Sequence, residues 1–396
     1  MKRRDFLCAA GAAAAAGSFA GRLWAADPAK GRFLLVFLRG GYDCANLLVP
    51  YSSSDYYATR PKIAIARPDP QSTTGALALD SNWALAPAVR DPLGALYKRG
   101  ELAFIPFAGT EDLTRSHFET QDSIELGQPL GATRDYTSGF LARLASQLTG
   151  PMPIAFTDAL PLSFKGSVDI PNQSARSVGR PVFDDRQSAL LASMYASNHL
   201  EAAVTDGLEL RKEVSQTMQE EMTSANRGAI TTKGFATEAT TIGQMMRDKY
   251  GLGFVDIGGW DTHVNEGSAS GNLANNLQNL AGGLSTLADT LGSEWRNTVV
   301  VVVSEFGRTF RENGNGGTDH GHGSVYWVLG GSIHGGQIAG RQQRVAINTL
   351  FQNRDYPVLN EYRSVLGGMF RSIWSLSPDA LQQVFPGATP LDLQLV

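Results

Sequence analysis

Runs of apolar residues alternate with polar, glycine-rich stretches along the chain and predict the strands of a sheet. The runs cover residues 33–38, 102–105, 253–257, 299–303 and 326–329. The fourth run consists entirely of valine. Continuous apolar runs of this length are typical of strands that are covered on both faces. The sequence therefore predicts a buried sheet.

A second pattern predicts helices between the strands. Between the third and fourth runs, leucines recur at steps of four and three residues, at Leu273, Leu277, Leu280, Leu284, Leu287 and Leu291. This spacing places them on one face of an amphipathic helix that packs against a sheet. The second half of the segment 106–127 also predicts a helix. Strands that alternate with helices predict an α/β fold with a largely parallel sheet.

Residues 184–244 differ from the rest of the chain. They are rich in Glu, Gln, Ser and Met, and their pattern is helical with few strand signals. We expect one or two long helices that are inserted into the domain as a cap. Two interpretations remain open: a lid that gates a substrate, or a plain covering layer for the sheet.

The first 26 residues predict a signal peptide. Arg3 and Arg4 precede a short apolar stretch, 8–20, which is followed by small residues near Ala25 and Ala26. Paired arginines at this position are typical of twin-arginine signals. The stretch is too short for a stable membrane span, and no later segment approaches that length. We expect the twin-arginine translocation machinery as a partner and the periplasm as the location; the alternative is a free basic terminus.

Chain length, charge and cysteine content limit the number of domains and the kinds of partner. Residues 27–396 form one large domain, or one domain with a cap. The formal net charge is −4, and the basic residues are scattered, so no basic face predicts a nucleic-acid partner. Beyond the signal, Cys44 is the one cysteine, which excludes an internal disulfide. Cys44 is predicted to be a buried apolar side chain rather than a nucleophile.

Residues able to carry chemistry follow four of the apolar runs. They are Asp43 after the first, Thr114, Ser116, His117, Glu119 and Asp122 after the second, Asp261 and His263 after the third, and Glu305, Arg308, Asp319, His320 and His322 after the fourth. The carboxyl ends of parallel strands meet at one edge of a sheet, so we expect these side chains to gather there. A mixed set of imidazoles and carboxylates suits zinc, manganese or iron better than calcium. The sequence therefore predicts a site for one or two divalent metal ions.

Each part of this set also has a plainer interpretation. An aspartate after a Gly-Gly turn, such as Asp43, is commonly a turn or cap residue. Glu119 and Asp122 fit solvated helix positions. The spacing by two of Asp261 and His263, and of His320 and His322, puts each pair on one side of an extended segment. The repetition at four strand ends is what favours a metal site.

The motifs that carry these residues resemble a known family. LRGGYDCANLLVPY, SHFETQD, DIGGWDTH, VVVVSEFGRT and NGNGGTDHGHGSVYWVLGG occur in this order over nearly the whole of 27–396. Together they resemble the bacterial family called domain of unknown function 1501, whose members are typically exported with twin-arginine signals. That family is more distantly similar to the alkaline phosphatase and sulfatase superfamily. The resemblance implies a three-layer α/β/α sandwich with one or two divalent metals and a nucleophile at a helix start.

The resemblance also implies roles for individual residues. The metal ligands would be Asp43, Asp261, His263, Glu305 and His320 or His322. The nucleophile would be Ser116, with Thr114 as second choice. His117 would be an acid, a base or a ligand, and Arg308 and Arg39 would hold an anion. Phe306 stands where the superfamily has a metal-binding histidine. This substitution puts a complete two-metal site in doubt.

Three functions follow as hypotheses. The first is an exported metal-dependent hydrolase that acts on phosphate or sulfate esters of small anionic molecules. The second is a non-catalytic exported protein that keeps the fold, with a structural metal, and binds or assembles with partners in the envelope. The third is a carbohydrate-active enzyme that uses Asp43 and Glu305 as paired carboxylates.

Overall fold

The computed structural model describes residues 31–72, 74–173 and 225–396. The predicted signal peptide, 1–26, therefore lies outside the described residues. So does most of the predicted helical insert, up to residue 224.

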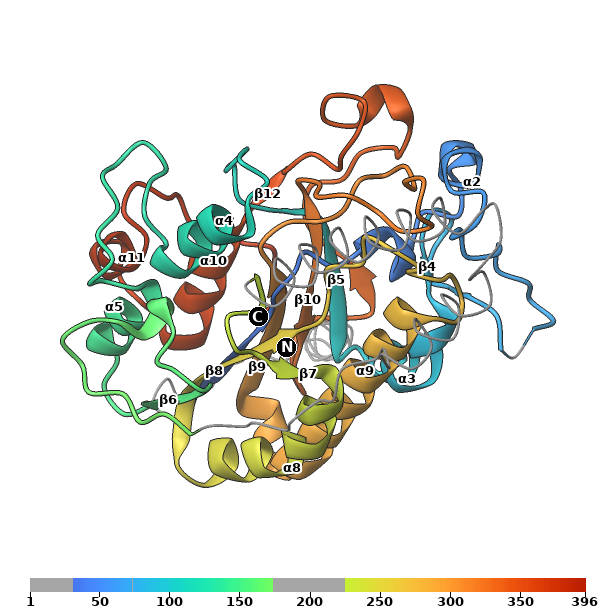
Figure 1. Ribbon diagram of the computed structural model, residues 1–396. Helices are drawn as coiled ribbons and strands as arrows, with labels where there is room; N and C mark the ends of the chain where they lie inside the picture. The colour runs from blue at the N-terminus through green and yellow to red at the C-terminus, as the bar shows by residue number, and fades with distance from the viewer. Residues whose placement is uncertain (1–30, 73, 174–224) are drawn as a thin grey trace, which may run out of the picture.

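All five apolar runs form strands of one central sheet (Figure 1). Its strands are β1 (Arg32–Leu38), β5 (Leu102–Gly109), β6 (Met152–Phe156), β8 (Tyr250–Gly258), β9 (Thr298–Ser304), β10 (Ser324–Leu329) and β11 (Gln337–Ile338), with β7 (Ile230–Thr231) beside β8 and β12 (Asn360–Glu361) beside β5. The order is β11-β5-β10-β9-β1-β8-β6. Every pairing is parallel except those of β10, which is antiparallel to both β5 and β9. The largely parallel sheet that the sequence predicted is confirmed.

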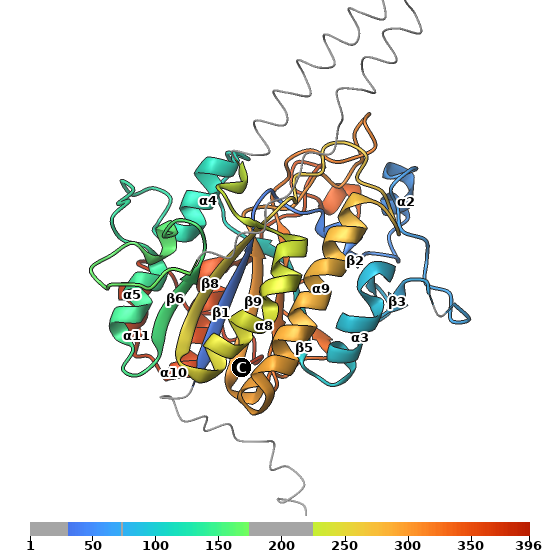
Figure 2. The same ribbon diagram turned by 60° about the horizontal axis from the view of Figure 1, so that its bottom comes forward.

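Helices cover both faces of this sheet (Figure 2). One layer contains α3 (Arg90–Lys98), α8 (Thr232–Asp248) and α9 (Asn272–Leu291); the other contains α4 (His117–Leu126), α5 (Phe140–Gln147), α10 (Tyr362–Trp374) and α11 (Pro378–Val384). The side chains of β1 alternate between the two resulting cores, since Leu34 faces the first and Phe33 the second. The architecture is the three-layer α/β/α sandwich that we expected.

Smaller elements lie beside the main sheet. They are α2 (Ser54–Thr59) and a short antiparallel sheet of β2 (Leu48–Val49), β4 (Ala84–Leu85) and β3 (Leu77–Ala78).

The leucine repeat is the buried face of α9, as its spacing predicted. Helix α8 packs against α9 and β8. The last part of the predicted insert, 232–244, lies within α8, so this part belongs to a layer that covers the sheet. Within the described parts of the chain, no helix is long and apolar enough to cross a membrane.

The strand directions bring four loop regions together. Strands β1, β8 and β9 are parallel neighbours. Strand β5 runs in the same direction as β9, because β10 pairs with both in the antiparallel sense. The segments that follow these four strands therefore begin at one edge of the sheet.

Candidate metal centre

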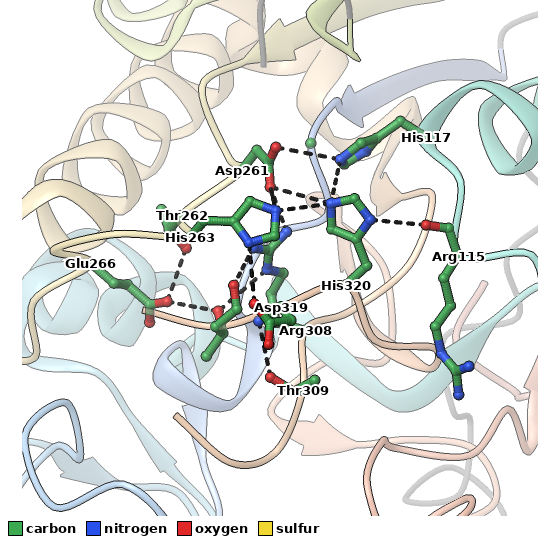
Figure 3. A network of polar contacts seen from close by, with 12 residues as sticks. Arg115, His117, Asp261, Thr262, His263, Glu266, Arg308, Thr309, Asp319 and His320 are labelled. Atoms are coloured by element: carbon green, nitrogen blue, oxygen red, sulfur yellow. Dashed lines mark hydrogen bonds and ion pairs between the residues drawn. The ribbon is translucent and has the colours of Figure 1, made fainter. Parts of the chain in front are cut away.

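Three side chains from separate loops converge at this edge (Figure 3). His117 begins α4 after β5, Asp261 follows β8, and His320 lies in the loop after β9. The Nε2 atoms of His117 and His320 are 3.0 Å apart. Oδ2 of Asp261 lies 3.5 Å from Nε2 of His117, and its Oδ1 lies 3.6 Å from Nε2 of His320. An antiparallel bridge between Arg308 and His320 holds the third loop against the end of β9.

The outer nitrogens of the two imidazoles fix where their protons lie. Nδ1 of His117 is 2.8 Å from Oε1 of Glu305. Burial opposes ionisation of Glu305, but the hydrogen bond from His117 lowers the pKa of this carboxyl to about 2, so it accepts. Nδ1 of His320 is 2.9 Å from the carbonyl oxygen of Arg115, which can only accept. Both neutral rings therefore carry their proton on Nδ1.

It follows that two nitrogen lone pairs face each other at Nε2. Unshared pairs at 3.0 Å repel, so a positive charge between or beside them, either a proton or a metal ion, would stabilise the neutral rings in this arrangement. Burial disfavours a proton on His117, but hydrogen bonds with Asp261 and Glu305 outweigh it and raise the pKa of this imidazole to about 9. The cluster is therefore built to attract positive charge.

The distances fit a metal ion. Four ligand atoms placed tetrahedrally at the usual zinc bond length of about 2.0–2.1 Å are about 3.3 Å from one another. The separations of 3.0, 3.5 and 3.6 Å in the cluster bracket this value. Two imidazole nitrogens and one carboxylate oxygen suit zinc, manganese or iron. A divalent cation thus fits these three residues.

His263 lies at the rim of the cluster. Its Nε2 is 3.0 Å from Oδ1 of Asp261 and 3.0 Å from Nε2 of His320. Its Nδ1 faces Oδ1 of the exposed Asp319 at 3.4 Å. The side chain of His263 is partly exposed, as is that of His320, so His263 lies between the cluster and solvent.

Arg308 holds Asp261 in place. Its Nη1 donates to Oδ1 of Asp261 at 2.6 Å, and its Nε and Nη2 donate to the hydroxyl and carbonyl oxygens of Thr318. Burial would raise the pKa of Asp261, but its contacts with the three histidines and the charge of Arg308 hold this pKa well below its usual range. Arg308, whose side chain is fully buried, therefore positions a carboxylate; the resemblance had assigned it to an anionic substrate.

Glu305 acts on the cluster through His117. Its Oε1 accepts from Nδ1 of His117, the backbone N–H of Gly40 and the amide of Gln121, and its Oε2 accepts from Ser304. A carboxylate that orients a ligating histidine in this way is typical of metal sites. Glu305 is thus a partner of a ligand in this structure, although the sequence suggested that it was a ligand itself.

Glu305→Gln is expected to lower the affinity for zinc or manganese by about 10–100-fold, because the amide weakens the hold on Nδ1 of His117. Isothermal titration calorimetry of the variant would measure the loss. Glu361→Gln is the matched control, since Glu361 caps α10 instead. Equal affinity in the two variants would contradict the role given to Glu305.

Asp43 and His322, two further predicted ligands, do not join the cluster. The carboxylate of Asp43 pairs with the buried Arg60 and caps a short 3-10 helix, which is the plainer role that the sequence had left open. The ring of His322 packs against Phe351 at a centroid distance of 5.0 Å. Burial and the charge of Arg115 lower the pKa of His322 to about 4. The spacing by two therefore brings together Asp261 and His263 only.

The remaining candidates lie as follows. Ser116 is the N-cap of α4, and its hydroxyl accepts from the backbone of Glu119 at 3.5 Å. Thr114 donates its hydroxyl to Asp112. Arg39 is buried and donates to Asp256, Gln121 and Glu125, so it is not available to hold an anion. Glu119 pairs with Arg134, and Asp122 with Arg227.

Sequence reasoning missed several partners of the site. They are Arg60, Gln121 and the carbonyl group of Arg115. Gln121 lies one helical turn after His117 on α4, a spacing that could have indicated a shared face. Nothing in the local pattern marks Arg60, which reaches Asp43 from a separate loop, or the backbone carbonyl.

Several solved structures match this chain at low overall similarity. A protein in the alkaline phosphatase superfamily from Vibrio parahaemolyticus has 10% sequence identity and a TM-score of 0.34, over 76% of this chain and 60% of that one. A putative sulfatase from Bacteroides thetaiotaomicron has 10% identity and a TM-score of 0.40, over 92% and 74%. The lipoteichoic acid synthase LtaP from Listeria monocytogenes has 8% identity and a TM-score of 0.41, over 93% and 76%. The chain thus spans less than two thirds of the Vibrio protein.

Sequence comparison gives the family. None of the curated protein sequences matches this chain. One family model, described as protein of unknown function (DUF1501), matches residues 30–385, which include every part of the metal centre. The chain therefore belongs to the DUF1501 family.

Proposed function

We propose that the chain is a metal-dependent hydrolase of phosphate or sulfate esters. One observation carries the proposal: the Nε2 atoms of His117 and His320 lie 3.0 Å apart beside the carboxylate of Asp261. These three residues would hold a zinc, manganese or iron ion. A bound divalent cation supplies Lewis acidity, which polarises a phosphoryl or sulfuryl oxygen and lowers the pKa of water. The ester class follows from the resemblance of the motifs to phosphatases and sulfatases.

Two further residues have roles in this proposal. Ser116 is the nucleophile, because it directly precedes His117 at the start of α4, where the helix dipole stabilises an anion. Its Oγ gives its proton to solvent water and attacks phosphorus or sulfur. The bond from phosphorus or sulfur to the alcohol oxygen breaks as the new bond forms, which leaves a covalent enzyme ester. Nε2 of His263, near Asp261 and next to solvent, gives its proton to the departing alcohol oxygen. Water then hydrolyses the enzyme ester and releases Ser116 and the inorganic anion.

The proposed site of action is the periplasm. Support comes from the arginine pair, the short apolar stretch and the small residues within the first 26 positions. The substrate would be a small anionic ester that is encountered after export. Cleavage of the signal in the mature protein, found by N-terminal sequencing, would test this part.

A second candidate has its own support. Arg39 and Arg308, the two arginines that were expected to hold an anionic ester, are both buried and engaged with protein groups. This favours a non-catalytic exported protein with a structural metal. The paired-carboxylate hypothesis has no such support, since Asp43 is held by Arg60, and Glu305 accepts four hydrogen bonds while fully buried.

Hydrolysis of bis(p-nitrophenyl) phosphate and p-nitrophenyl sulfate by the zinc- or manganese-loaded chain would separate the candidates. We expect turnover that stops on chelation, and a loss of more than about 100-fold in kcat for Ser116→Ala. Ser377→Ala is the matched control, because Ser377 is also a helix N-cap. Each variant should lose about 1 kcal/mol of stability, but only Ser116→Ala should lose turnover.

The result of this assay distinguishes the hydrolase from the non-catalytic protein. A chain that binds metal and hydrolyses neither ester would favour the non-catalytic candidate. Metal-dependent turnover that survives Ser116→Ala would remove Ser116 as the nucleophile and leave water in that role.

A further inference from the structure

A second buried aspartate at the same sheet edge is already neutralised by the protein. Asp43 follows β1 and is paired with Arg60, and the side chains of both are almost completely buried. Nη1 of Arg60 donates to Oδ2 of Asp43, and Nη2 donates to Oδ1 at 3.0 Å. This is the bidentate arrangement that a guanidinium and a carboxylate prefer. Both oxygens of Asp43 are therefore in contact with a permanent cation.

Arg60 is held firmly in this position. A guanidinium has five N–H donors. Besides the two bonds to Asp43, Nη1 donates to Oδ1 of Asn46 at 3.1 Å, Nη2 to the carbonyl of Thr309 at 2.9 Å, and Nε to the carbonyl of Phe310 at 2.7 Å. Each of the five donors thus has an acceptor. Displacing Arg60 to admit a metal ion would leave several buried acceptors unpaired.

The charges around Asp43 balance without a metal ion. Within the described part of the chain, Glu266 is an acidic neighbour of this pair, and its Oε2 accepts from the hydroxyls of Thr262 and Thr318. Burial and the neighbouring charge of Asp43 raise the pKa of Glu266, which favours its neutral form. One carboxylate and one guanidinium then cancel.

An apolar ring fills the space beside the histidines. The ring of Phe306 lies 4.9 Å from that of His117 and 5.1 Å from that of His320, between ring centroids. It also lies against Gly41, where a Cβ atom would be 2.4 Å from the phenyl carbons. Phe306 offers no ligand atom, and its packing against Gly41 leaves no room for a side chain at that position.

We infer that the centre binds a single divalent cation, and that Arg60 is a built-in cation that serves Asp43 in place of a second ion. The inference rests on the proposed function, because it specifies how many ions that site holds. It also limits the chemistry: two ions can stabilise the attacking and the leaving oxygen together, whereas a single ion leaves one of these oxygens to protein groups such as His263.

The number of bound ions tests the inference. Elemental mass spectrometry after dialysis against zinc or manganese would give ions per chain for the wild type, Asp43→Asn and Asp261→Asn. The two variants are matched, since each removes a buried aspartate that is paired with a buried arginine at this edge. We expect one ion in the wild type, one in Asp43→Asn and none in Asp261→Asn.

Other numbers of bound ions would contradict the inference. Two ions in the wild type, falling to one in Asp43→Asn, would overturn the inference and leave the proposed function standing. A folded wild type without bound metal would overturn both. If Asp43→Asn does not fold because Arg60 is left without its partner, Asp43→Asn/Arg60→Met removes both charges together, and it should still bind one ion.

Discussion

Asp261→Asn is expected to lower the affinity for zinc or manganese by more than about 100-fold, beyond the usual effect of changing a group that only orients a ligand. Among the described residues, Asp261 is the carboxylate whose oxygens lie within 3.6 Å of both His117 Nε2 and His320 Nε2. The amide keeps the shape but removes the charge. It also leaves the buried guanidinium of Arg308 uncompensated beside the ion. Isothermal titration calorimetry of the metal-free chain would measure the change.

Asp319→Asn is the control for this prediction. Asp319 is also a neighbour of His263, but it is 54% exposed, and its carboxylate contacts His263 rather than His117 or His320. Its charge is screened by water, so the affinity should remain within about threefold of the wild type. Similar affinities for Asp261→Asn and Asp319→Asn would show that the ion, if bound, lies elsewhere.

The second large effect concerns stability. Arg39→Met should lower the free energy of unfolding by about 3–5 kcal/mol, because removing one partner of a buried ion pair leaves uncompensated charge. Arg39 donates to Asp256 at 2.6 Å and to Glu125 at 2.9 Å, and all three side chains are buried. The substitution therefore affects two carboxylates at once. Urea denaturation followed by tryptophan fluorescence would give the difference.

Arg99→Met, the same change at an exposed arginine, is the control for Arg39→Met. Arg99 pairs with Glu101, but the arginine side chain is 55% exposed, so Arg99→Met should cost less than about 1 kcal/mol.

The loss of stability caused by Arg39→Met should also depend on pH. Burial already raises the pKa of Asp256 above its usual value, and losing Arg39 raises it further. A carboxyl whose pKa is higher in the folded than in the unfolded state destabilises the fold at high pH, so the deficit should shrink as the pH falls toward the ordinary pKa of an aspartate.

The fold could be predicted because its signals are local and strong. Leu34 and Phe33 face opposite cores from one continuous apolar strand, and this is what a strand between two helical layers requires. The leucine spacing of α9 likewise follows from a single apolar face. Strand directions then gathered Asp261, His263 and His320 from separate segments, because parallel strands share a carboxyl edge.

The finer details of the site could not be predicted in this way. His322 and His320 are two residues apart, yet only His320 reaches the cluster, because their glycine-rich loop does not keep the alternation of a strand. Arg60 reaches Asp43 across a loop whose path no periodicity determines. The acceptor of His320 is a backbone carbonyl, which has no signature in the sequence. These features depend on tertiary packing rather than on local pattern.

The coordination of zinc in the loaded chain tests the central claim most directly. X-ray absorption spectroscopy should show nitrogen and oxygen ligands at about 2.0–2.1 Å, with the multiple scattering that at least two imidazole rings produce. His320→Gln should remove one imidazole from this signal. A zinc ion that is surrounded by oxygen alone, or a spectrum that His320→Gln leaves unchanged, would contradict a metal centre built on His117, Asp261 and His320.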